Sequence, residues 1–156
     1  MDKTYVVAVF WDIMKFYDML SLVLLVSLAI ESGFPLELLA MEIFWHVCPR
    51  LVKVAGWTHD VPLFNDRGLL AGLRFSNSLA RIMIYPIIEA LHWRLPQNVR
   101  FEASCVVHDV TEYVFADTEQ TAIVHAKHAI RIMLSQMCVH ELVVSQKSTC
   151  IASTQG

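Results

Sequence analysis

The sequence predicts an α+β fold in which helices cover one face of an antiparallel sheet. Residues 5–11 form an unbroken run of β-branched and aromatic residues, typical of a strand buried on both faces. Two later strand-like stretches, 99–107 and 111–115, are separated by a short turn. Apolar residues at helical spacing occupy three segments between them: 19–31, 36–47 and 73–91. Strand pairs interleaved with packed helices favour the α+β class.

Length and composition limit the domain count and the kind of partner. The 156 residues fit one domain, 1–156, yet 56% are hydrophobic and only 17% are charged. Mean hydropathy is +0.49. The longest apolar run, 20–30, is shorter than the roughly 20 residues that a membrane span needs. We therefore expect a missing partner or missing flanking sequence to cover apolar surface, and no membrane span.

Charge and cysteine usage are also informative. The net charge of −3 gives no sign of the basic face that a free-standing nucleic-acid binder usually carries. The four cysteines are scattered without a CxxC pair, and no secretory signal is visible. Buried, reduced thiols in an intracellular protein are therefore expected.

The first strand ends at a carboxylate. Asp12 follows the apolar run directly. Burying its charge against an apolar core would cost roughly several kcal/mol of folding free energy unless the carboxylate is paired, hydrogen-bonded or bound to a cation. A simple strand cap is the plainer alternative. Asp18 is expected to be the N-cap of the next helix, which Gly33 would end, and Pro35 would open helix 36–47.

The middle of the chain predicts a hairpin and a helix. Residues 50–54 alternate charged and apolar side chains, as in a half-exposed strand, and Gly56 would turn it. Residues 58–65 would form a loop or the second hairpin arm. Pro86 lies inside helix 73–91, so a kink or break is expected there.

The second half predicts a hairpin of strands 99–107 and 111–115, turning at His108 and Asp109. If this hairpin lies beside the first strand, Asp12 and Asp109 meet at one sheet edge. A helix from Asp117 to about Met137 follows, and 141–153 would form two short strands.

Four stretches resemble, in order, the motifs of reverse transcriptases, and most closely those of non-LTR retroelements and group II introns. Residues 12–18 resemble the first catalytic motif, 106–109 lie where that family has a Tyr-x-Asp-Asp hairpin, and 140–148 look like its lysine motif. Residues 68–91 align without gaps with the motif around its Gln-Gly pair. The matched positions there are Gly68, Gly72, Ser76, Pro86 and Glu89.

The resemblance implies a palm subdomain, an antiparallel sheet backed by helices, with fingers and thumb largely absent. It implies RNA-directed DNA polymerase chemistry on an RNA template, a DNA primer and a dNTP, using two Mg²⁺ or Mn²⁺ ions about 4 Å apart. Asp12 and Asp109 would be the catalytic metal ligands, since magnesium prefers carboxylate oxygens. Lys147 would be a catalytic proton donor to pyrophosphate. The substrate-binding positions would be the Ile13 backbone, Gly72 and Tyr17, the last where the family blocks a ribose 2′-hydroxyl.

The reacting centre departs from the family pattern. One of two adjacent aspartates is missing, because His108 stands beside Asp109, and histidine suits magnesium poorly. Ala71 replaces the glutamine and Leu73 the serine of the second motif. These losses predict a degenerate palm with weak or absent catalysis.

Other candidate sites carry less weight. His125 and His128 could bind a metal with His140 or His108, but solvated or core histidines are the expectation. Three tryptophans could stack on bases, although packing in the core or hairpin is expected: Trp45, Trp57 and Trp93.

Three functions remain open from the sequence. The chain could be an active polymerase palm, a retroelement-derived pseudoenzyme that keeps the fold without the chemistry, or an apolar interaction module unrelated to nucleic acid.

Overall fold

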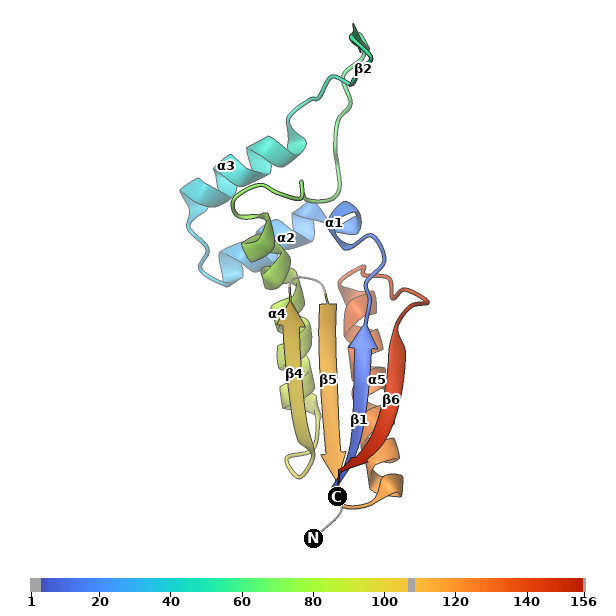
Figure 1. Cartoon of the computed structure of the whole chain (residues 1–156). Coiled ribbons are helices and arrows are strands. Elements are labelled where there is room, and N and C mark those ends of the chain that lie inside the picture. Colours follow the sequence, from blue (N-terminus) through green and yellow to red (C-terminus); the bar gives the residue numbers. More distant parts are fainter. Residues whose placement is uncertain (1–3, 107–108, 156) are drawn as a thin grey trace.

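The computed structural model describes residues 4–106 and 109–155, and its centre is a four-stranded antiparallel sheet of order β4-β5-β1-β6. Strand β1 (Thr4–Trp11) pairs with β5 (Asp109–Ala116) on one side and with β6 (Thr149–Gln155) on the other. Strand β4 (Arg100–Val106) pairs with β5. Figure 1 shows helices α4 (Ser76–Arg94) and α5 (Glu119–Val139) against one face, with the other face uncovered. The predicted combination of an antiparallel sheet and helices is confirmed.

The two faces of the sheet differ because side chains alternate along each strand. On β1, Val7, Val9 and Trp11 are buried beneath the helices, whereas Phe10 is 38% exposed. Burial of this strand on both faces, as predicted, is therefore wrong at the end that leads to Asp12.

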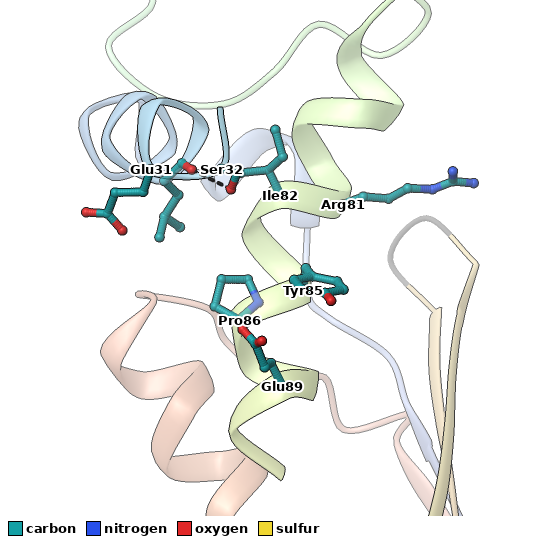
Figure 2. Close-up of a pocket in the computed structure, with 8 residues that line it drawn as sticks. Glu31, Ser32, Arg81, Ile82, Tyr85, Pro86 and Glu89 are labelled. Carbon is teal, nitrogen blue, oxygen red and sulfur yellow. Dashed lines mark hydrogen bonds between the residues drawn. The ribbon is translucent and has the colours of Figure 1, made fainter. Parts of the chain in front are cut away.

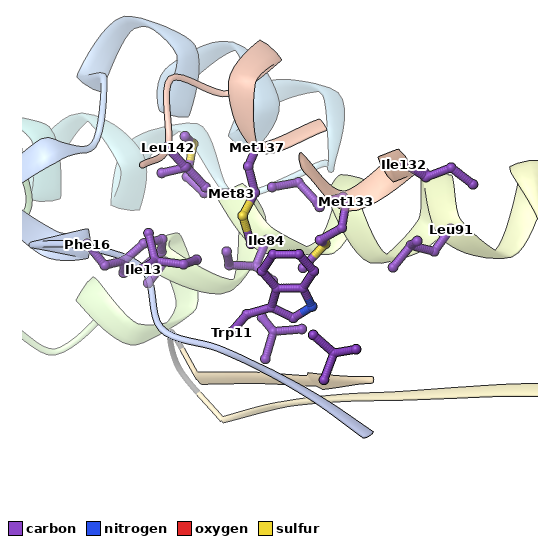
Figure 3. Close-up of a cluster of buried hydrophobic side chains, with 14 of the residues drawn as sticks. Trp11, Ile13, Phe16, Met83, Ile84, Leu91, Ile132, Met133, Met137 and Leu142 are labelled. Carbon is purple, nitrogen blue, oxygen red and sulfur yellow. The ribbon is translucent and has the colours of Figure 1, made fainter. Parts of the chain in front are cut away.

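The core lies between the sheet and the two long helices. The indole of Trp11 lies there among Ile84 of α4 and Met133 of α5 (Figure 3). Pro86 lies within α4, and the helix continues through it to Arg94, so the predicted break is absent. The predicted helix 117–137 corresponds to α5, whose N-cap Thr118 accepts from the N–H of Thr121 at 3.2 Å.

Three helices follow β1: α1 (Phe16–Met19), α2 (Leu22–Glu31) and α3 (Leu36–Val47). The predicted N-cap at Asp18 is wrong, because this residue lies inside the short α1. Ser21 caps α2 instead, its hydroxyl accepting from the N–H of Leu24 at 3.5 Å. Gly33 follows α2 at a φ of +71°, which confirms the predicted stop.

An arm of residues 36–65 extends from the body and ends in a small hairpin of β2 (Lys53–Val54) and β3 (Trp57–Thr58) (Figure 1). Both short strands are exposed, so the half-exposed strand predicted over 50–54 is shorter and more open than expected. The exposed fractions of Trp45, Trp57 and Trp93 are 53%, 83% and 82%. Their predicted packing in the core or hairpin is wrong.

The C-terminal segment contains one long strand where two short ones were predicted. Val144 forms only an isolated bridge with Ile13, and β6 follows after a loop. The strand end at Val107 and the turn residue His108 lie outside the described residues.

Thiols and membrane spans complete the description. The described cysteines form no disulfide, but Cys138 and Cys150 are exposed and Cys48 and Cys105 half-buried, so the predicted burial is wrong. In the described part of the chain, no helix combines the length and apolarity needed to span a membrane.

Candidate functional site

The register of β1 and β5 brings Asp12 and Asp109 to the same end of the sheet. The ladder between the two strands ends at the pair Trp11 and Val110; Asp12 directly follows β1, and Asp109 is the first residue of β5. Because Val110 is buried on the covered face, alternation along β5 places the exposed Asp109 on the uncovered face, whereas Asp12 lies just beyond the end of β1 and is half-buried. Strands β1 and β5 are neighbours, which is the condition on which the sequence analysis made the meeting of Asp12 and Asp109 depend. The edge formed by Asp12 and Asp109 is called the carboxylate edge below.

The loop before β6 fixes the backbone of Asp12. The N–H of Ser145 donates to the carbonyl of Asp12 at 2.8 Å. The Ser148 hydroxyl accepts from the N–H of Asp12 at 3.0 Å and also donates to its carbonyl at 3.3 Å. Lys147 lies on this loop with its side chain exposed. The structure therefore gathers Asp12, Asp109 and the Lys147 loop at one end of the sheet.

Ile13 can face a substrate only through its backbone. Its side chain is 3% exposed and belongs to the core, where Figure 3 shows it near Phe16. Beside it, the N–H of Met14 donates to the carbonyl of Val143 at 2.8 Å. The backbone around Ile13 is thus held by the segment that leads to Lys147.

Tyr17 is positioned by helices and not by the strand ends. Its O–H donates to Oδ1 of Asn77 at 2.6 Å, linking α1 to the first turn of α4. Its ring meets Phe16 edge-to-face at 5.6 Å, and burial raises the pKa of the Tyr17 phenol. No sequence pattern singled out Asn77, because a lone exposed asparagine in a helix carries no signal.

Gly68 and Gly72 have different physical roles. Gly68 has a φ of +82°, and a Cβ there would lie 2.7 Å from the carbonyl oxygen of Tyr17. The N–H of the next residue, Leu69, donates to that same oxygen at 2.7 Å. Gly72, at φ +94° with open space around it, lies on the exposed turn before α4. Gly68 is therefore needed for close packing against α1, and Gly72 for the turn.

A buried pair holds the segment after the arm. The N–H of Leu70 donates to Nδ1 of His46 at 2.9 Å, which leaves the ring proton on Nε2, 3.8 Å from Oε2 of Glu42. Burial lowers the pKa of His46, and the charge of Arg50 lowers it further. This neutral histidine is structural, since it anchors the turn before α4 to α3.

Glu112 is an ionisable residue that the sequence analysis missed. It lies on β5 between Val110 and Val114, fully buried on the covered face, and neither carboxyl oxygen has a hydrogen-bond partner among the described residues. Burial raises the pKa of Glu112 to about 7. The indole N–H of Trp11 lies nearby and opposes this rise, although its geometry does not meet the criteria for a hydrogen bond. The signal available in the sequence was the two-residue spacing of Glu112 from Val110 and Val114, which puts all three side chains on the same face of a strand.

Over 4–106 and 109–155, no three His, Cys, Asp or Glu side chains are grouped to hold an ion. This argues against a site built from His125, His128 and His140, whereas His108 is not described. Two carboxylates do fit one Mg²⁺, which commonly takes one or two of them and completes its octahedron with water and phosphate oxygens.

Comparison with known proteins identifies the fold alone. No protein-family model matches the sequence, and no curated protein matches it. Among solved structures, the fold is similar to that of apo telomerase from Candida tropicalis truncated from the C-terminal domain, with a TM-score of 0.65 and 13% sequence identity. The similarity covers 98% of this chain and 31% of the telomerase chain. The chain thus has a fold like part of a reverse transcriptase, and it spans about a third of that protein.

Proposed function

We propose that the chain is a reverse-transcriptase-like palm whose polymerase chemistry is weak or lost, derived from a non-LTR or group II intron type of element. The observation that supports this proposal most directly is the pairing of Trp11 with Val110, the neighbours of Asp12 and Asp109, at one end of the sheet. The telomerase-like fold and the ordered sequence motifs support it independently.

The proposal gives each predicted site residue a role. An ion such as Mg²⁺ or Mn²⁺ at Asp12 and Asp109 would activate a primer 3′-hydroxyl and stabilise the leaving pyrophosphate. The exposed ammonium of Lys147 could hold a proton beside that edge. The Ile13 backbone, Tyr17 and Gly72 would contact the dNTP or the RNA template and DNA primer.

The sequence around Asp109 explains the weak chemistry. Two-metal transfer needs ligands for both ions, and the family's second aspartate is absent here. Glu112, the other carboxylate on β5, cannot substitute because it lies three residues on, buried on the opposite face. The proposed palm would therefore hold one ion with low affinity.

The test compares the unmodified chain with three variants: His108→Asp, His108→Asn as its neutral control, and Asp12→Asn. We expect Mn²⁺ binding at one site in the unmodified chain, with an affinity about tenfold or more higher in His108→Asp, corresponding to at least roughly 1.4 kcal/mol. Binding should be lost in Asp12→Asn, and the chain should add at most traces of dNTP to an RNA-templated primer. Fast, metal-dependent extension by the unmodified chain would contradict the loss of chemistry. Mn²⁺ binding unaffected by Asp12→Asn would contradict the site.

A second candidate is a retroelement-derived, non-catalytic interaction module. The observation that favours it is the arm, where most apolar side chains beyond α3 are exposed: Leu51, Val52, Val54, Trp57, Leu63 and Phe64. Exposed apolar surface of this extent is typical of interaction sites. This candidate predicts self-association that Trp57→Ser weakens, measured by sedimentation, together with no Mn²⁺ binding at Asp12.

A further inference from the structure

The arm meets the body of the molecule through α3, and this helix buries few side chains. Its buried residues are Leu39, Glu42 and His46. Spacings of three and four residues place them in one stripe on a single face of the helix. Two of the three are ionisable, and Glu42 and His46 are only 3% and 0% exposed. The attachment of the arm therefore depends on ionisable groups as well as on apolar ones.

Helix α2, which precedes the arm, is attached in a different way. Its buried side chains are all apolar: Leu22, Leu25 and Ala29. The end of α2 lies beside α4, where Leu28 and Ile82 line a cavity of about 590 Å³ between the two helices (Figure 2). There the Ser32 hydroxyl donates to the carbonyl of Leu28 at 2.7 Å. The buried contacts of α2 contain no group that titrates, so their strength does not depend on pH.

Three consecutive N–H groups hold the segment that follows the arm. Gly68 and Leu69 each donate at 2.7 Å to a backbone carbonyl of α1 or of its C-cap. Leu70 donates instead to Nδ1 of His46 at 2.9 Å. A backbone carbonyl accepts at any pH near neutrality, whereas an imidazole nitrogen can take up a proton. Only the third of these bonds is therefore sensitive to acid.

The bond between Leu70 and His46 is also the polar link between the arm and the body. Apart from the first helical bond of α3, to Pro35, no other hydrogen bond or ion pair joins residues 36–65 to the rest of the described chain. The remaining hydrogen bonds of the arm stay within it, such as the one from the Arg50 guanidinium to the carbonyl of His46 at 2.9 Å. Loss of the Leu70 bond thus removes this link.

A proton on Nδ1 of His46 is incompatible with that bond. The nitrogen that accepts from Leu70 would become a donor, and two N–H groups would face each other at 2.9 Å. The other ring nitrogen, Nε2, carries the proton of the neutral ring and lies 3.8 Å from Oε2 of Glu42. The acid form of His46 therefore cannot keep the contact that the neutral form makes.

The groups around the ring act on its protonation in opposite directions. Burial and the charge of Arg50 both lower the pKa of His46, so the ring is neutral while the contact is closed. The Glu42 carboxyl group faces Nε2 and favours the charged ring when it is ionised. Other charged side chains on the elements around the ring are exposed: Glu31 on α2, Glu37 on α3, Asp66, Arg67 and Arg74 after the arm, and Arg81 on α4.

We propose that His46 makes the attachment of the arm acid-sensitive: protonation of its imidazole breaks the bond to Leu70 and releases α3, with the hairpin of the arm, from the body. The contact is closed above pH 6.5, the ordinary pKa of histidine, and opens progressively below it, because the released form binds a proton that the closed form excludes. Gly68 and Leu69 keep the following segment in place. The proposal uses no residue of the carboxylate edge and does not rest on the proposed function.

The test follows amide hydrogen exchange by NMR at Leu69 and Leu70, neighbours whose acceptors differ in kind. We expect the protection factor of Leu70 to fall by up to about tenfold for each pH unit below 6.5, because opening takes up one proton. The protection factor of Leu69 should change much less. Equal loss at both amides would mean that the whole segment unfolds, and constant protection at Leu70 would mean that the arm is not released. Either result would overturn the proposal.

A variant separates acid sensitivity from packing. His46→Asn places a side-chain oxygen near the position of Nδ1, so it can accept from Leu70 but does not titrate. The steep pH dependence of Leu70 protection should disappear in this variant. His59→Asn, at an exposed histidine of the arm, is the matched control and should keep it. A fall in Leu70 protection that is as steep in His46→Asn as in the unmodified chain would contradict the role of His46.

Discussion

The two faces of the central sheet are built from the same strands but differ in what surrounds them. On the covered face, Val9, Trp11, Val110 and Val114 are buried under α4 and α5. On the uncovered face, most residues of the same strands are partly exposed, although Val6 is buried, and Phe10 is the clearest case at 38%. The contrast teaches that the covered face supplies the core of the fold, while the other face leaves side chains such as Phe10 in contact with solvent.

Glu112 is the exception that makes the comparison informative. It places a carboxyl group on the face that otherwise holds apolar side chains, and no described residue offers a hydrogen bond to offset its burial. Asp109, three residues earlier on the same strand, is exposed at the edge. One strand thus carries one acidic side chain that is exposed and another whose burial favours its neutral form.

The largest expected effect is a difference in unfolding free energy between alanine variants at two neighbouring positions of β1. Trp11→Ala should lower the free energy of unfolding by about 3–5 kcal/mol, because it leaves a large cavity between sheet and helices. Phe10→Ala, on the uncovered face, should cost about 1 kcal/mol, since much of its ring is already in water. Urea unfolding of both variants checks the comparison, and equal losses would contradict the assignment of the two faces.

The second effect concerns pH. Because the folded-state pKa of Glu112 is raised to about 7, its protonated form stabilises the fold fully below pH 4.5, the ordinary value, and that stability is lost as pH rises through 7. The total loss is about 3 kcal/mol at 1.4 kcal/mol for each pKa unit. Glu112→Gln should flatten this part of the profile, measured by urea unfolding between pH 4 and 8. Glu102→Gln, at an exposed position of β4, is the control and should keep the slope.

The smallest effect tests how the carboxylate edge is held. Ser148→Ala removes a hydroxyl that bonds both backbone groups of Asp12, and should cost about 1–2 kcal/mol at roughly 1 kcal/mol for each hydrogen bond. Ser153→Ala, on β6 and exposed, is the matched control. If Ser148→Ala changes neither stability nor Mn²⁺ affinity, the loop does not position Asp12.

Local patterns predicted several elements closely. The predicted helix 36–47 matches α3, and the run 5–11 lies within β1, because periodicity and turn residues fixed both. The sequence analysis left the pairing of β1 with the later hairpin open as a condition, and the sheet meets that condition. The resemblance to reverse transcriptases agrees with the telomerase-like fold.

Other features depend on tertiary contacts that a pattern does not contain. The apolar composition of the arm was compatible with packing, and only the fold shows Trp57 in solvent. Asp18 has the chemistry of an N-cap, but α1 intervenes and Ser21 takes that role. The hydrogen bonds from residues 145 and 148 to Asp12 span 133 and 136 positions, and no local signal indicates them.

The most direct test of the account is paramagnetic NMR with Mn²⁺, which reports which backbone amides lie near the ion. We predict broadening centred on the amides of Asp12, Asp109 and Ser148, abolished by either Asp12→Asn or Asp109→Asn. That result would establish that the two carboxylates act as one site. Broadening elsewhere, or broadening at this edge that survives both substitutions, would contradict the central claim that the paired strand ends form a divalent-ion site.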